Sequence, residues 1–282
     1  MPAQTQNVNP SFSIRPAVAT NTETHLLIEA GPAGISFVVE DDEHFFSALV
    51  SYTFPLNMDS EELAASIDGI IKNEPLLKRQ FKKTDIVWAF PEAMLVPHAW
   101  MNDATAGDML NLVHGDLNKG EVKSDFMFKH NLHSVYRVPL AVAAVFARHF
   151  LFASQTHQYA VLPDLLANVP NQLYVIFYNN RLTAMLHKES KLQAIQNFCY
   201  QNPEDAAFHL LDLCRAFDVA PTEVVVKYSG MIDEGSNLFA TIYKYFLTLS
   251  PAGAGENVSM NEGIQKYPAH FFSHLFATAI CV

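Results

Sequence analysis

One order of predicted elements occurs twice along the chain, and this repetition limits the possible folds more than any other feature. Each copy has three β-rich runs, then a helical run that opens with a capping residue, then a fourth β-rich run. In the first half these runs lie at 24–28, 35–39, 44–54, from 57 onward and at 84–90. In the second half they lie at 172–178, 182–186, 191–200, 202–214 and 223–229. The sequence therefore predicts the order β-β-β-α-β in both halves.

The two copies also keep a similar spacing. Leu173 follows Leu26 by 147 residues in the first strands, and Val225 follows Ile86 by 139 residues in the fourth strands. A long period with only two units indicates a duplicated domain and not a solenoid. A chance coincidence of two common α+β patterns is the alternative.

Other predicted elements surround these runs. Turn-forming residues join the first two strands of each half, with Glu-Ala-Gly-Pro-Ala-Gly at 29–34 and Asn-Asn at 179–180. The remaining predictions are a strand pair at 125–130 and 132–138, helices at 140–150, 155–168, within 233–249 and at 267–279, and a flexible loop at 251–256.

The chain length of 282 residues suggests one large domain or two modest ones. The polar arm at 1–20 is expected to be disordered. The repeated pattern divides the rest into a first subdomain at 21–150 and a second at 151–282. No low-complexity tract or long linker separates them, so we expect them to pack closely.

Charge and apolar content exclude several classes of function. The 18 basic and 29 acidic residues give a net charge of −11, which repels phosphate backbones and argues against nucleic-acid binding. The longest mostly apolar run, 139–147, is shorter than the roughly 20 residues of a membrane span. No signal peptide is visible. The three cysteines, Cys199, Cys214 and Cys281, are widely spaced among apolar neighbours, so buried reduced thiols and a cytoplasmic protein are expected.

Short motifs connect the repeat with a known fold. The strand exit at Phe54–Leu56, the turn at Phe177–Asn180 and the helix start at Pro203–Asp205 resemble one bacterial family, a domain of unknown function with an actin-like ATPase fold. The resemblance covers residues 24–282. It implies an α/β fold of two ribonuclease H-like β-β-β-α-β-α subdomains, arranged as in actin, the 70-kDa chaperones and sugar kinases.

The resemblance also implies where a nucleotide would bind. In nucleotide-hydrolysing proteins of this fold, the first hairpin of each half holds an acidic, glycine-containing phosphate loop that works with Mg²⁺. Here Glu29, Gly31 and Gly34 stand in the first hairpin, but Pro32 replaces the usual Ser or Thr and donates no N–H. The second hairpin turn, at 178–181, has neither an acid nor a glycine.

The last candidate for a nucleotide site follows the fourth strand of the second half. There Gly230 keeps one glycine of the expected adenosine-binding turn. An alternative interpretation of all these residues needs no ligand. Gly31 and Gly34 are then hairpin glycines with positive φ, Gly230 ends a strand, and Glu29 is a solvated hairpin acid.

Two other clusters also have alternative interpretations. His270 and His274 have a metal-binding i, i+4 spacing on a predicted helix, but no His-Glu-x-x-His motif and no third ligand is evident. The basic residues at 72–83 indicate either a surface for an anionic partner or a solvated connection between a helix and a strand. Histidine pairs such as His130 and His133 arise by chance among twelve histidines. The sequence contains no Walker A loop, serine-hydrolase elbow or dinucleotide fingerprint.

The expected function follows from the incomplete phosphate loops. We expect a degenerate, non-catalytic actin-like protein that acts as a protein-interaction or scaffold module, with no cofactor and no metal. Its partner is another protein or a second copy, because a chain with only 17% charged residues suits an interface core. The alternative is an ATP-binding switch or ATPase that holds Mg-ATP in the interlobe cleft. A metal-dependent hydrolase that uses His270 and His274 is a third hypothesis.

Overall fold

The computed structural model describes residues 9–15, 23–116, 119–165, 170–255 and 258–282. The chain divides into two compact units: unit 1 is Met1–Ala160 with Ser259–Ile264, and unit 2 is Val161–Val258 with Gln265–Val282. The predicted boundary at 150/151 lies before that division, because the strand at Ser154–His157 pairs within unit 1. Most of the arm expected to be disordered lies outside the described residues, but Phe12–Ile14 forms a strand.

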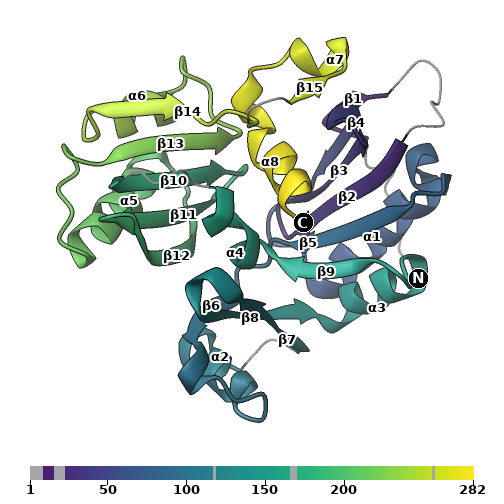
Figure 1. Ribbon diagram of the computed structural model, residues 1–282, viewed down its shortest axis with the longest axis horizontal. Coiled ribbons are helices and arrows are strands. Elements are labelled where there is room, and N and C mark those ends of the chain that lie inside the picture. Colours follow the sequence, from purple (N-terminus) through teal and green to yellow (C-terminus); the bar gives the residue numbers. More distant parts are fainter. Residues whose placement is uncertain (1–8, 16–22, 117–118, 166–169, 256–257) are drawn as a thin grey trace. The chain divides into compact units, whose positions relative to one another are not determined.

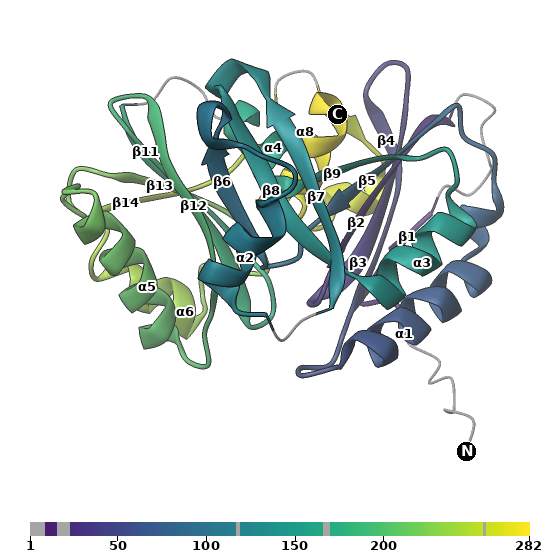
Figure 2. The same cartoon turned by 90° about the horizontal axis from the view of Figure 1, so that it is seen from below.

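Unit 1 is built on a seven-stranded sheet of order β1-β4-β3-β2-β5-β9, with β15 beside β4 (Figure 1). Its strands are β1 (Phe12–Ile14), β2 (Glu23–Gly31), β3 (Gly34–Asp41), β4 (Phe45–Thr53), β5 (Lys83–Trp88), β9 (Ser154–His157) and β15 (Ser259–Met260). β2, β3 and β4 form an antiparallel meander, whereas β5 runs parallel to both β2 and β9. The helices α1 (Ser60–Asn73) and α3 (Leu140–His149) lie side by side on one face of this sheet (Figure 2).

A three-stranded antiparallel sheet is inserted between β5 and α3 (Figure 2). Its strands, in the order β6-β8-β7, are β6 (Ala93–Pro97), β7 (Gly120–Met127) and β8 (Leu132–Pro139). The short 3₁₀ turns η2 (His98–Trp100) and η3 (Phe128–His130) follow β6 and β7, and the helix α2 (Ala106–His114) packs on the sheet. The predicted strand pair at 125–130 and 132–138 located β8 and the end of β7 and missed β6.

Unit 2 is built on a five-stranded sheet of order β12-β11-β10-β13-β14. Its strands are β10 (Asn171–Phe177), β11 (Arg181–Lys188), β12 (Lys191–Cys199), β13 (Val225–Gly230) and β14 (Thr248–Pro251). The main helices are α5 (Pro203–Ala216), α6 (Asn237–Tyr243) and α8 (Ser273–Cys281). Shorter elements elsewhere in the chain are η1 (Pro75–Lys78), α4 (Gln158–Val161), η4 (Leu162–Leu165), α7 (Glu262–Gln265) and η5 (Ala269–Phe271).

The two main sheets share one topology. The strands β4-β3-β2-β5-β9 correspond one for one to β12-β11-β10-β13-β14, with three antiparallel strands followed by two parallel ones. α1 and α5 occupy the same place in the order of elements. The predicted order β-β-β-α-β is therefore confirmed in both halves.

Capping residues explain where the two matching helices begin. The Asp59 side chain accepts hydrogen bonds from Glu61 N and Glu62 N at the start of α1. Asn202 caps α5 in the same manner, with Pro203 at the first helical position and Asp205 completing the capping box. These start signals are local, which is why the sequence alone located both helices.

Three expectations differ from the structure. The predicted helix at 155–168 begins as β9, because Ser154–His157 pairs with β5. The last helix begins at Ser273 and not at 267, after the separate turn η5. Of the cysteines, only Cys214 is buried, and Cys199 and Cys281 are exposed.

Among the described residues, no helix is both long and apolar enough to span a membrane.

Candidate functional site

The first hairpin joins β2 to β3 and carries three of the predicted site residues. Gly31 pairs with Gly34 across the hairpin, and Pro32 and Ala33 form the turn between them. Glu29 lies two residues before Gly31, within β2, and is buried. The expectation of a solvated acid is therefore wrong.

The two glycines of this hairpin are needed for space, and the expected positive φ is wrong: neither has one. A Cβ added at Gly31 would lie 2.8 Å from the Ala89 carbonyl oxygen, and one at Gly34 would lie 2.3 Å from the Tyr52 carbonyl oxygen. Both contacts are with backbone, which cannot move aside cheaply. Close packing of neighbouring chain segments thus explains these glycines without a ligand, and their binding of phosphate stays a prediction.

The second hairpin, between β10 and β11, is closed by its own neighbours. Tyr178 N donates to Arg181 O at 2.8 Å across the turn. The Tyr200 hydroxyl donates to Tyr178 O at 2.9 Å, and Tyr200 N donates to Asn180 O at 3.0 Å. These bonds engage the Tyr178 N–H and the carbonyl groups of Tyr178, Asn180 and Arg181, and Tyr200 holds the turn against the end of β12.

Gly230 is the last residue of β13, as the ligand-free interpretation expected. Its φ is +84°, and an added Cβ would lie only 2.1 Å from Phe177 O at the end of β10. The following residue, Met231, donates its N–H to the same Phe177 oxygen at 2.7 Å. This sharp exit from the sheet requires glycine both for its backbone conformation and for its space.

A polar cluster in unit 2 joins the end of β13 to the last helix. The Ser229 hydroxyl lies 2.9 Å from His274 Nδ1, 2.8 Å from Ser273 Oγ and 2.9 Å from His270 O. His270 Nε2 donates to Ile232 O at 2.8 Å. All four cluster side chains are buried, so Ser229 is not exposed as a nucleophile would need to be.

The predicted histidine pair does not lie on one continuous helix. His270 lies in η5, and His274 lies in α8 beyond the intervening Phe272. Within the described ranges, no group of three His, Cys, Asp or Glu side chains is placed to hold a metal ion. Both histidines instead form hydrogen bonds in the polar cluster at the end of β13, His274 with Ser229 and His270 with the Ile232 carbonyl oxygen.

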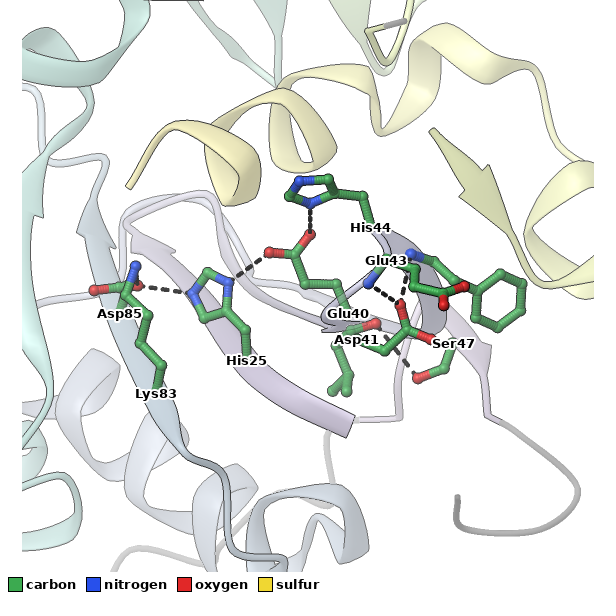
Figure 3. Close-up of polar contacts among 10 residues, drawn as sticks. His25, Glu40, Asp41, Glu43, His44, Ser47, Lys83 and Asp85 are labelled. Atoms are coloured by element: carbon green, nitrogen blue, oxygen red, sulfur yellow. Dashed lines mark hydrogen bonds and ion pairs between the residues drawn. The ribbon is translucent and has the colours of Figure 1, made fainter. Parts of the chain in front are cut away.

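A buried charged cluster in unit 1 was not predicted as a site (Figure 3). His25 Nδ1 lies 2.7 Å from Glu40 Oε1, and His25 Nε2 lies 2.7 Å from Asp85 Oδ2. Lys83 Nζ lies 2.9 Å from the same Asp85 oxygen, and His44 Nδ1 lies 3.6 Å from Glu40 Oε2. Because each ring nitrogen of His25 lies 2.7 Å from a carboxylate oxygen, these contacts favour the protonated imidazole.

Strand register brings this cluster together. His25 on β2 is opposite Glu40 on β3 and Lys83 on β5, and Asp85 shares their face because it lies two residues further along. The register shifts beside the His25–Glu40 pair, between Glu23 and His25 on β2 and between Val39 and Glu40 on β3. Such bulges re-aim side chains. The sequence signal that could have located this cluster is one ionisable residue next to the apolar run of each of three predicted strands: His25, Glu40 and Asp85.

The environment of this cluster shifts two pKa values. Burial lowers the pKa of His25, but the adjoining Asp85 and Glu40 carboxylates outweigh burial and raise it above its ordinary 6.5. Burial raises the pKa of Asp85, but hydrogen bonds and charges from His25 and Lys83 outweigh it and lower the pKa below 3.8. The two carboxylates therefore keep the proton on His25 up to a higher pH than a free imidazole would keep it.

These shifts predict a pH dependence of stability for unit 1. The protonated His25 stabilises the folded unit fully below pH 6.5, and this part of the free energy of unfolding is lost as the pH rises through the raised pKa of His25. The ionised Asp85 stabilises the folded unit fully above pH 3.8, and this part is lost as the pH falls through the lowered pKa of Asp85. Urea unfolding followed by tryptophan fluorescence measures this, because both tryptophans, Trp88 and Trp100, lie in unit 1. We expect stability to fall above pH 6.5. A flat profile from pH 6 to 9 contradicts the assignment.

The basic residues at 72–83 are largely paired with acids. Lys72 contacts Asp68, and Lys82 contacts Asp42 at 3.3 Å, in addition to the Lys83–Asp85 pair. These ion pairs favour the interpretation as a solvated connection.

Comparison with solved structures identifies the fold. A protein with actin-like ATPase fold and unknown function from Bacteroides thetaiotaomicron VPI-5482 aligns with a TM-score of 0.73 and 14% identity, over 93% of this chain and 97% of that chain. A chain of a PilM-PilN type IV pilus biogenesis complex aligns with a TM-score of 0.60 and 12% identity, over 92% and 98%. The ethanolamine utilization protein EutJ from Carboxydothermus hydrogenoformans gives 0.52 and 9%, over 95% and 93%. At such identities the likeness shows the fold alone.

Sequence comparison identifies the family. No curated protein matches this sequence. The model of a protein family of unknown function, DUF3822, matches residues 16–249, which is well over half of the chain. The chain therefore belongs to the DUF3822 family, and it has the actin-like ATPase fold with two ribonuclease H-like subdomains.

Proposed function

We propose that this chain is a non-catalytic actin-like protein that acts by binding a partner protein. The observation that carries the proposal is the second hairpin. It has no carboxylate and no glycine, and Tyr200 donates to three of its carbonyl oxygens, those of Tyr178, Asn179 and Asn180. In this fold, Mg²⁺ and the phosphates need a carboxylate for the metal and a glycine-containing loop whose N–H groups converge on phosphate, and this turn has neither a carboxylate nor a glycine.

The first hairpin supports the same proposal. Pro32 at its tip has no N–H to donate, and the two glycines beside it are required by close backbone packing. Glu29 is the one carboxylate in the hairpin segment 29–34. The residues of the two hairpins therefore fit Mg-ATP poorly.

The nature of the partner follows from composition and fold. Half of the residues are apolar and 17% are charged, which suits a surface buried against another chain. A structural neighbour belongs to the PilM-PilN type IV pilus biogenesis complex, which is an assembly of proteins. The partner is another protein or a second copy of this chain. The protein works in the cytoplasm of a bacterium, as the sequence led us to expect.

A thermal-shift titration with Mg-ATP tests the proposal. A ligand at 100 times its Kd adds about 2.7 kcal/mol to stability, which would raise the melting temperature of units of this size by about 5 °C or more. We expect no shift with Mg-ATP up to millimolar concentration, and no phosphate release in a coupled ATPase assay. An actin-like protein that binds ATP serves as the positive control.

The alternative function is an ATP-binding switch or ATPase that uses Glu29, Gly31 and Gly230. It predicts a clear Mg-ATP shift that is lost in Glu29→Ala. That result, with the variant still folded by circular dichroism, would replace the non-catalytic proposal.

A further inference from the structure

The inserted three-stranded sheet of unit 1 carries exposed aromatic side chains at one end. Phe126 in β7 is 48% exposed, Phe128 in η3 is 84% exposed, and Trp100 in η2 is 73% exposed. Large apolar side chains gathered in this way on a folded domain mark interaction sites more often than isolated ones do. We call His98, Phe126, Phe128 and His133 the aromatic platform.

Ring contacts show that the aromatic platform is a packed group. Phe126 has ring-centroid distances of 4.8 Å to His98, 4.9 Å to His133 and 6.2 Å to Phe128. His98 and His133 are stacked at 5.2 Å, and His98 Nδ1 lies 2.9 Å from His133 Nε2. The rings therefore hold one another in place before any partner arrives, which lowers the entropy lost on binding.

The fold explains why this end of the sheet is open. Phe126 and Val96 are both opposite His133 in the strand register, and Val135, two residues along β8, lies on the same face. α2 packs over Val135 and Val96. Phe126 lies beyond that cover and stays half exposed.

The charge around the aromatic platform differs from that of the whole chain. The protein has a net charge of −11, yet residues 93–101 and 126–134 contain no acid. The same segments contain Lys129 and three histidines. β-pairing brings the two segments together through β8. Aromatic rings beside Lys129 and the exposed His98, on segments that contain no carboxylate, complement a partner that carries carboxylates beside apolar side chains.

We propose that the aromatic platform is the docking surface for an acidic peptide segment of a partner protein, with an apolar side chain on Phe126 and Phe128 and carboxylates near His98 and Lys129. This inference rests on the proposed function and names the partner's chemistry. Exposed aromatic residues at the centre of an interface carry most of the binding energy. The carboxylates set orientation and discriminate against basic partners.

Selection from a phage-displayed library of random dodecapeptides against the immobilised full chain tests the proposal. We expect enriched peptides to combine Asp or Glu with Leu, Phe or Trp. The enriched peptide is then synthesised and its affinity measured for two matched variants, Phe128→Asp and Phe128→Lys. Both lose the ring, but only Phe128→Asp adds a repelling charge, so it should bind about tenfold or more weakly than wild type, with Phe128→Lys between.

The control is Phe152→Ser, which removes a 96% exposed aromatic ring elsewhere on unit 1 and should leave peptide binding unchanged. Since Phe128 is largely exposed, its variants should fold, and circular dichroism checks this. Enrichment of basic peptides, equal binding by Phe128→Asp and Phe128→Lys, or no enrichment overturns the proposal. So does a concentration-dependent dimer in light scattering that both variants abolish, because the occupant is then a second copy. The Mg-ATP titration tests the non-catalytic function independently of these outcomes.

Discussion

The substitution His25→Leu is expected to lower the free energy of unfolding of unit 1 by about 3–5 kcal/mol at pH 7. The side chain is buried between Glu40 and Asp85, and leucine has a similar volume but no charge. Asp85 keeps Lys83 at 2.9 Å, whereas among the side chains that the structure describes Glu40 keeps only His44 as an ion-pair partner, at 3.6 Å. Most of the lost stability therefore comes from the Glu40 carboxylate, which stays buried after its partner His25 is removed. Urea unfolding followed by tryptophan fluorescence measures it.

Two further variants make this prediction specific. His44→Asn removes the exposed histidine of the cluster and suits the positive φ of 58° at that position, so it should cost less than about 1 kcal/mol. Adding Glu40→Gln to His25→Leu should recover part of the lost stability, because the buried group is then neutral. If the double variant is as unstable as His25→Leu, or less stable, the cluster is not held together by charge.

The substitution Gly230→Ala is expected to destabilise unit 2 by about 2–4 kcal/mol. The methyl group would lie 2.1 Å from Phe177 O, and φ is +84°, which alanine rarely adopts. Relieving the contact means shifting the Met231 N–H that donates to the same oxygen at 2.7 Å. Hydrogen exchange with mass spectrometry on peptides from β10 and β13 measures the change in local stability.

Gly115→Ala is the matched control for Gly230→Ala. Gly115 has nearly the same φ, +83°, but an added Cβ has no atom within 4 Å. It should cost about 1–3 kcal/mol from backbone strain alone, because its φ of +83° and ψ of 174° lie in a region that is essentially restricted to glycine. Equal losses at the two positions would show that backbone conformation, and not the contact with Phe177, makes Gly230 necessary.

The candidate site could be predicted from sequence only in part. The Glu29–Gly34 hairpin and the strand end at Gly230 have local turn signals, so their places in the fold were predicted correctly. Their packing was not: Gly31 and Gly34 need space beside Ala89 and Tyr52, which are distant in sequence. The burial of Glu29 likewise depends on the strands around it.

The His25 cluster and the aromatic platform were missed for one common reason. His25, Glu40 and Asp85 lie on three strands, and the bulges beside them set which side chains meet. In the platform, η2 follows β6 and meets Phe126 of β7 only because β8 pairs with both strands. Neither set has a characteristic spacing in the sequence.

The sequence by itself determined the repeated β-β-β-α-β order and the starts of α1 and α5, because periodicity and capping act between residues close along the chain. Only the tertiary structure decided the fifth strands, β9 and β14, since each has four residues and is a strand through its parallel neighbour. It also decided which charges are buried together and which aromatic rings stay exposed. These outcomes depend on strand register and on the cover given by α2, which are contacts between residues far apart in the chain.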